Sequence, residues 1–201
     1  AGLILGVIAF TGVWSRFSSL LLGVATSPLL PDSIGVLMAM FFAMLIAIVL
    51  GMGMPTTAAY AVAASVVAPG LSTILEPSLA GFDDPDRMSR LIAHFFVFYF
   101  AVISAITPPV ALASYAAAGI SGADPMRTSF SSFKIGLAAF IVPFMFFYSP
   151  AMLMEGSTVE IAHIAVSATI GVFLLSSAVQ GWFFGRLIGL FRAALLAGAL
   201  L

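Results

Sequence analysis

The sequence predicts an all-α polytopic membrane protein, and three observations support this fold class. Hydrophobic residues make up 62% of the 201 residues and charged residues only 7%, whereas soluble domains carry about 25% charged residues. Two long stretches, 33–75 and 91–123, contain no Asp, Glu, Lys or Arg. Each of these stretches is interrupted near its centre by a cluster of helix-breaking and hydroxyl residues, Gly, Ser, Thr and Pro.

Composition also excludes several classes of function. The formal net charge is −1 and the seven basic residues are scattered, which excludes a nucleic-acid partner. The chain has no Cys, which excludes disulfides and thiol chemistry. No phosphate-binding loop and no paired catalytic carboxylates occur, so we do not expect an enzyme. Both ends of the sequence lie in apolar runs, and we therefore expect a fragment of a longer protein.

A bilayer core about 30 Å thick requires roughly 20 helical residues, and several segments approach this length. In order, the sequence predicts an apolar helix at 1–14, a softer stretch at 20–25, a strongly apolar span at 34–50, a second arm at 58–75, an aqueous loop at 76–90, an aromatic helix at 91–106, a small-residue arm at 110–120, a loop at 124–134, spans at 135–154 and 161–181, and a truncated last helix.

Length distinguishes the two interrupted stretches. The first is long enough for two helical arms, and its turn carries no charge. We therefore predict a re-entrant helical hairpin over 34–75 whose tip is buried in protein. As one straight helix, the second would extend about 50 Å at about 1.5 Å per residue, which exceeds the bilayer core. It is too short for two spans, so we predict a broken transmembrane helix over 91–122.

The distribution of Lys and Arg gives a weak preference for membrane orientation. Alternation of the predicted spans places four basic residues on one side and three on the other. The side with four is favoured as cytoplasmic. The four are Arg127, Lys134, Arg186 and Arg192, and the three are Arg16, Arg87 and Arg90.

The two interruptions leave backbone groups available to bind ions. Proline lacks an N–H and displaces the carbonyl four residues earlier, so Pro55 would free the carbonyl of Gly51. Pro108 and Pro109 would likewise free those of Ser104 and Ala105. Carbonyls at the C-terminus of a half-helix, together with Thr hydroxyls, suit a monovalent cation such as Na⁺. The N-terminus of the half-helix that follows suits an anion such as a carboxylate.

Structural explanations compete with this interpretation. Isolated prolines such as Pro69, Pro143 and Pro150 are expected to be kinks at which neighbouring helices satisfy the freed backbone groups. His94 and His163 are expected to be interfacial or packed, and two distant histidines make no zinc site. No charged residue lies deep in a predicted span, which argues against a carboxylate proton relay and favours coupling through backbone and hydroxyl oxygens.

The motifs around the interruptions resemble a known family. Together they are similar to the C-terminal half of the large membrane subunit of tripartite ATP-independent periplasmic (TRAP) transporters, in the form in which small and large subunits are fused. The resemblance covers about residues 1–155, and 161–201 resemble the C-terminal extension of the fused forms. The motifs are Leu50-Gly-Met-Gly-Met-Pro-Thr-Thr-Ala-Ala-Tyr60, His94-Phe-Phe-Val-Phe-Tyr-Phe-Ala-Val-Ile-Ser-Ala-Ile-Thr-Pro-Pro-Val-Ala-Leu-Ala113, Ala116-Ala-Ala-Gly-Ile-Ser-Gly-Ala-Asp-Pro125 and Phe140-Ile-Val-Pro-Phe-Met-Phe-Phe-Tyr-Ser-Pro150.

The resemblance implies an elevator-type transporter built from inverted repeats. The hairpin 34–75 and the broken helix 91–122 match the second repeat, within a second-repeat part at 1–155 that is followed by an extension at 156–201. The resemblance also implies Na⁺-coupled uptake of small organic acids across a prokaryotic plasma membrane, with no further cofactor. The implied partners are an extracytoplasmic solute-binding protein, the rest of the permease (its first repeat and small-subunit part) and the lipid bilayer.

Two alternatives to this function remain open: a non-transporting membrane assembly subunit and a channel.

The resemblance also assigns candidate site residues. The cation candidates are Gly51, Gly53, Thr56, Ser104 and Thr107, and the substrate candidates are Pro55, Thr57, Pro108 and Pro109.

Overall fold

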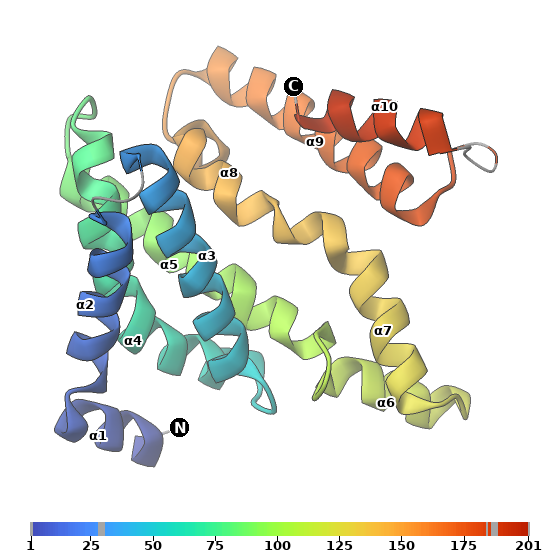
Figure 1. Ribbon diagram of the computed structural model, residues 1–201, viewed down its shortest axis with the longest axis horizontal. Helices are drawn as coiled ribbons and strands as arrows, with labels where there is room; N and C mark the ends of the chain where they lie inside the picture. The colour runs from blue at the N-terminus through green and yellow to red at the C-terminus, as the bar shows by residue number, and fades with distance from the viewer. Residues whose placement is uncertain (1, 28–30, 184, 186–188, 201) are drawn as a thin grey trace.

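The computed structural model describes residues 2–27, 31–183, 185 and 189–200, and every regular element in these ranges is a helix (Figure 1). The predicted all-α class is therefore confirmed. The elements are α1 Gly2–Thr11, α2 Val13–Ala25, α3 Asp32–Gly51, α4 Thr56–Leu75, η1 Glu76–Leu79, α5 Pro85–Ile103, η2 Ser104–Ile106, α6 Leu112–Ser121, α7 Pro125–Gly136, η3 Leu137–Phe140, α8 Val142–Tyr148, η4 Pro150–Leu153, α9 Thr158–Gln180 and α10 Gly189–Leu200.

Within the described ranges, five helical segments are long and apolar enough to cross a membrane. This finding confirms that the chain is a polytopic membrane protein. The segments are Ser33–Gly51, Thr56–Leu79, Pro85–Ile106, Pro125–Tyr148 and Thr158–Gln180.

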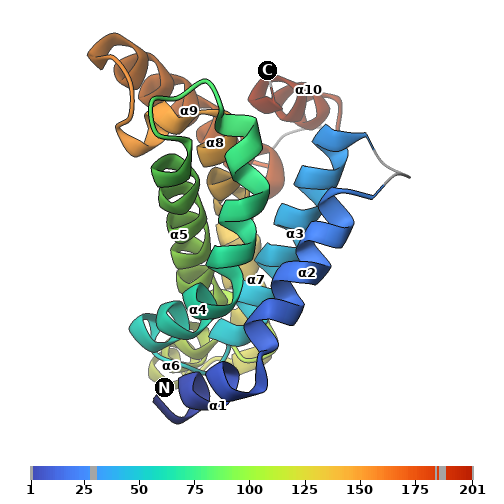
Figure 2. The same ribbon diagram turned by 90° about the vertical axis from the view of Figure 1, so that its left-hand side faces the viewer.

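The core lies between α2, α3, α4 and α5, which run alternately up and down the molecule (Figures 1 and 2). Phe96 and Phe100 of α5 are completely buried, and their ring centroids lie 4.8 Å apart. Phe144 of α8 packs edge-on against both rings, at 5.4 and 6.1 Å. Aromatic pairs in this geometry add about 0.5–1.5 kcal/mol beyond burial. The Phe-rich run of α5 therefore fixes the helix that leads to the second interruption.

The start of α5 differs from the prediction. The broken helix begins at Pro85 rather than at 91. Asp84 is its N-cap, and its Oδ1 accepts the Arg87 N–H at 2.9 Å. An acidic N-cap followed by Pro at the first helical position starts a helix whether or not the sequence is apolar. The prediction marked only the apolar part and treated this polar segment as a loop.

The span predicted at 135–154 also begins earlier and ends earlier. Its helix starts at Pro125, and Oδ1 of the N-cap Asp124 accepts the Arg127 N–H at 2.8 Å. The candidate membrane segment ends at Tyr148. It includes Lys134, which the prediction placed in the loop at 124–134. Residues 125–134 are polar in sequence, and the cap rather than apolarity makes them helical.

The structure places Arg16 and Arg87 differently from the prediction of membrane orientation. Gly12, with φ +64°, separates α1 from α2, so the predicted helix 1–14 is two helices. Arg16 lies near the start of α2 and Arg87 near the start of α5, and these starts are at opposite ends of the bundle (Figure 1). The prediction placed both residues on one side because it did not expect a continuous helix over Val13–Ala25. Arg186 lies outside the described residues.

The C-terminal extension forms a helical pair in which α9 packs against η3, η4 and α7, and α10 packs on α9 (Figure 1). α9 begins with a capping box: the Ser157 hydroxyl accepts the Glu160 N–H, and the Glu160 carboxylate accepts the Ser157 N–H. Arg192 of α10 donates to the carbonyls of Ala178 and Val179 at 2.9 and 3.3 Å. These bonds satisfy carbonyls that the last turn of a helix otherwise leaves unpaired.

We expect Gly70→Ala to weaken the packing of α2 on α4. A Cβ atom on Gly70 would lie 2.8 Å from both Cα and Oγ of Ser18, and overpacking of this kind costs about 1–3 kcal/mol. The better helix propensity of Ala returns up to about 1 kcal/mol. Denaturant unfolding of the permease in detergent should show the loss. Gly119→Ala is the matched control, because a Cβ there meets nothing within 4 Å. Equal stability of both variants would contradict the packing.

Candidate functional site

The first interruption separates α3 from α4. The last backbone hydrogen bonds of α3 end at Met52, whose N–H donates to the carbonyls of Ile48 and Val49. Gly53 then adopts φ +77°, a conformation that strongly favours Gly. Pro55 is the N-cap of α4 and has no N–H to continue the helix from α3.

The second interruption separates α5 from α6. The α-helix tightens into η2, where the Thr107 N–H donates to the Ser104 carbonyl at 3.2 Å. The Ala105 carbonyl has no donor three or four residues later, because those positions are Pro108 and Pro109. Ala111, with φ 34°, then begins α6 in a left-handed conformation.

The two interruptions meet in space (Figure 1). A Cβ atom on Gly51 would lie 2.5 Å from Ser104 Oγ and 2.9 Å from Ser104 Cβ. A Cβ atom on Gly53 would lie 3.6 Å from Val110 Cγ1. Only a residue without a side chain allows this close approach of the end of α3 to η2. The C-terminal ends of two half-helices, with their partial negative charge, therefore lie together.

The hydroxyl groups at this junction are buried and oriented. Ser104 and Thr107 are 2% and 8% exposed. Ser104 Oγ donates to the Ala101 carbonyl at 2.7 Å, and Thr107 Oγ1 donates to the Ile103 carbonyl at 2.9 Å. A hydroxyl that donates its only proton to a carbonyl keeps lone pairs free as an acceptor or a cation ligand. The junction thus offers oxygen ligands, which hard cations prefer.

The carbonyls that the prolines were predicted to leave without a hydrogen-bond donor are only partly unpaired. The Gly51 carbonyl accepts only a long bond, 3.4 Å, from the Met54 N–H. The Ser104 carbonyl, predicted to be free, accepts the Thr107 N–H in the 3₁₀ turn instead. This shift to a tighter turn is a common way for a helix end to satisfy carbonyls.

The outer part of the hairpin tip is exposed in the described structure. Gly53, Pro55, Thr56 and Thr57 are all exposed, and Pro109 on the broken helix is exposed as well. Pro108 is half-buried. The packing of this chain by itself therefore does not bury these residues of the hairpin tip. Of the predicted residues, the structure brings Gly51 against Ser104, with Thr107 buried one turn away, and leaves the two threonines of α4 at the surface.

Sequence reasoning missed two contacts at this junction. The Tyr115 hydroxyl donates to the Pro109 carbonyl at 2.7 Å and so holds the segment before α6. Gly136, at the end of α7, faces Ile106, whose Cδ1 would lie 2.6 Å from an added Cβ. A Tyr shortly after a Pro-Pro pair is a usable signal for the first contact. No local pattern signals the second, because it joins distant segments.

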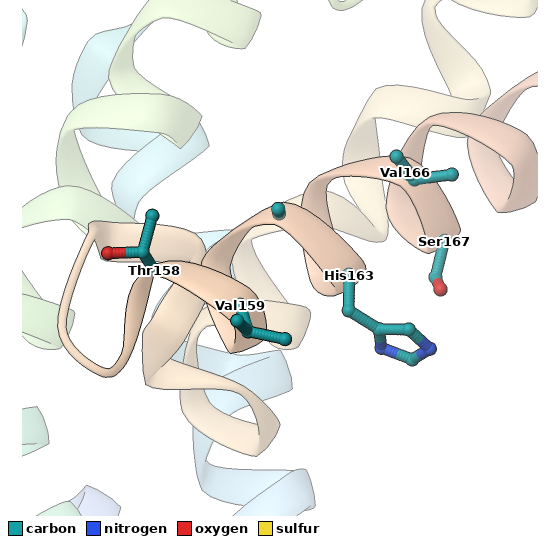
Figure 3. Close-up of a pocket in the computed structure, with 6 residues that line it drawn as sticks. Thr158, Val159, His163, Val166 and Ser167 are labelled. Carbon is teal, nitrogen blue, oxygen red and sulfur yellow. The ribbon is translucent and has the colours of Figure 1, made fainter.

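Hollows elsewhere on the surface do not coincide with this junction. One of about 640 Å³ lies on the outer face of α9 and is lined by Thr158, Val159, Ala162, His163, Val166 and Ser167. Figure 3 shows these side chains along one exposed face of a single helix, with His163 directed away from it. One open helix face gives no enclosed site, so the junction of the interruptions remains the candidate site.

The fold and the junction define a polytopic helical membrane protein in which two interrupted helices meet at polar, uncharged oxygen atoms. The family model of the tripartite ATP-independent periplasmic transporter, DctM component, matches residues 1–161. The chain therefore belongs to this family of secondary transporters and is a portion of a TRAP permease. No curated protein and no solved structure gives a match.

We expect cysteines at positions 53 and 110 to cross-link. The chain has no native Cys, and the Gly53 Cβ position lies 3.6 Å from Val110 Cγ1. The Gly53→Cys/Val110→Cys permease, in a cysteine-free background, should form a disulfide on mild oxidation, detected by a mobility shift after proteolysis between the two sites. Gly81→Cys/Val110→Cys is the control, because Gly81 precedes α5 at its opposite end. Equal cross-linking of the two pairs would show that the interruptions do not meet.

Proposed function

We propose that this chain is the second-repeat part of a Na⁺-driven permease that takes up small organic acids delivered by an extracytoplasmic solute-binding protein. Two findings support the proposal: membership of the DctM family and the close approach of Gly51 to Ser104. The second carries it, because it joins the two interruptions into one uncharged group of oxygen atoms. Discontinuous helices of this kind build ion and substrate sites in secondary transporters.

The cation binds between the two half-helix ends in this proposal. Its ligands come from carbonyls at Gly51 and Gly53 and from the hydroxyls of Ser104 and Thr107, and Thr56 contributes from the start of α4. Helix C-termini carry partial negative charge, which stabilises a monovalent cation without a carboxylate. Because no proton is needed, coupling follows the Na⁺ gradient.

The anionic substrate binds on the other side of each interruption. The N-termini of α4 and α6 present free N–H groups and partial positive charge, which suit a carboxylate. Thr57 and Pro55 line the first of these ends, and Pro108 and Pro109 precede the second. A bound Na⁺ lies between the two ends and strengthens carboxylate binding by direct Coulomb attraction. This attraction couples the two solutes.

Residues 1–155 act as the second-repeat part, and 156–201 form an extension. The hairpin of α3 and α4 and the broken helix of α5 and α6 move together as a unit in an elevator-type cycle, against a scaffold that the rest of the permease supplies. The protein resides in a prokaryotic plasma membrane, with lipid around its apolar faces. It works with the first repeat, the small-subunit part and the solute-binding protein.

Uptake into proteoliposomes tests this function. The full-length permease and its solute-binding protein are given labelled organic acids, with and without an inward Na⁺ gradient. The proposal predicts saturable uptake that needs both the gradient and the binding protein. Flux that does not saturate and persists without the binding protein would indicate a channel. A folded permease without uptake of any acid would indicate an assembly subunit.

We expect Thr107→Ala to raise the Na⁺ concentration for half-maximal uptake by about tenfold to a hundredfold, because a hydrogen-bonding group beside a charge contributes about 1.5–3 kcal/mol. Thr169→Ala is the matched control: Thr107 and Thr169 both donate to the carbonyl four residues earlier, at 2.9 and 2.7 Å, but Thr169 is on α9. Na⁺ titration of uptake measures both. An unchanged Na⁺ requirement in Thr107→Ala, at normal expression, would remove Thr107 from the site.

A further inference from the structure

A hydrogen-bonded aromatic pair joins the hairpin to the broken helix away from the candidate site. The Tyr60 hydroxyl of α4 lies 2.9 Å from Nδ1 of His94 of α5. Phe98, one turn along α5, packs edge-on against the Tyr60 ring at 5.6 Å. Together with Phe95, these side chains line a hollow of about 280 Å³. Among the described residues, this is the one hydrogen bond that joins the side chains of two membrane-spanning segments.

A histidine within a membrane-spanning segment is costly unless it is paired, and such residues mark functional positions. His94 lies within Pro85–Ile106, and Tyr60 satisfies its Nδ1. The tautomer of the His94 ring decides which group donates: Nδ1 accepts the proton of the Tyr60 hydroxyl when the ring carries its own proton on Nε2.

The positions of Tyr60 and His94 in their helices connect this hydrogen bond to the candidate site. Tyr60 follows Thr56 by four residues, so both lie on the same face of α4, in its first turns after the hairpin tip. His94 lies on α5, which continues directly into Ser104 and η2. The hydrogen bond therefore ties the start of the second hairpin arm to the helix that carries the buried hydroxyls. A shift of α4 along α5 would break it.

We propose that Tyr60 and His94 are positioning residues that hold the hairpin tip against the broken helix, so that cation binding at the junction depends on their hydrogen bond. This inference rests on the proposed function for its transport readout, but the geometry that it predicts can be measured without transport. It gives His94 a role other than packing or metal binding.

The first test is the Na⁺ dependence of uptake by the full permease. Tyr60→Phe keeps the ring and removes the donor, and it should raise the half-saturating Na⁺ concentration between about twofold and tenfold, with a smaller change in maximal rate. His94→Leu should do the same. His94→Asn places an amide oxygen near the position of Nδ1 and should restore most of the wild-type value.

Tyr99→Phe is the matched control, because Tyr99 lies on the same helix and its hydroxyl makes no hydrogen bond within the described residues; its ring packs on Phe146 at 6.1 Å. The double variant Tyr60→Phe/His94→Leu should be no worse than either single variant, since the same bond is lost. Additive losses, or a Tyr60→Phe permease that matches Tyr99→Phe, would overturn the proposal.

The second test does not depend on transport. The rate of disulfide formation between cysteines at positions 53 and 110 should fall when Tyr60→Phe is added and should not change with Tyr99→Phe. An unchanged rate of disulfide formation in Tyr60→Phe would overturn the positioning role, even if the permease shows Na⁺-coupled uptake. A wild-type permease without Na⁺ dependence would instead overturn the proposed function, and the cross-linking rate would still decide the role of the pair.

Discussion

Backbone groups that leave a helix inside a membrane must find new partners, and in this chain two such departures meet each other. The absence of a side chain at Gly51 lets the end of α3 approach Ser104 so closely that a single added carbon would collide with it. Hydroxyls, a tightened 3₁₀ turn and the Tyr115 side chain satisfy part of the exposed backbone. What remains unsatisfied is a small set of oxygen atoms, and this remainder is what a cation can use.

The surrounding helices hold this junction in place. Phe96 and Phe100 anchor α5 in the core, and α8 packs on them through Phe144. Gly136 brings the end of α7 against Ile106, so the broken helix is contacted from the hairpin on one side and from α7 on the other. A site that lacks charged ligands depends on such support, because its binding energy is spread over several weak dipoles whose positions must be fixed.

Much of the fold could be read from the sequence, and the errors have a physical cause. Apolarity and the Gly, Thr and Pro clusters located both interruptions, because these properties are local. The helix starts at Pro85 and Pro125 were missed, because a cap acts independently of hydropathy. The approach of Gly51 to Ser104 joins residues distant in the chain, so no local pattern could show it. The exposed state of the hairpin tip also depends on tertiary packing.

The proposed cation site lies where Gly51 approaches Ser104, and direct binding of radioactive Na⁺ tests it. Purified full-length permease and its Gly51→Ala variant are immobilised for scintillation-proximity measurement without substrate. We expect saturable binding to the wild type that excess Na⁺ displaces and K⁺ does not. Binding should be weaker by at least about tenfold in Gly51→Ala, because its added carbon separates the two half-helix ends. Equal Na⁺ binding by both folded proteins would contradict it.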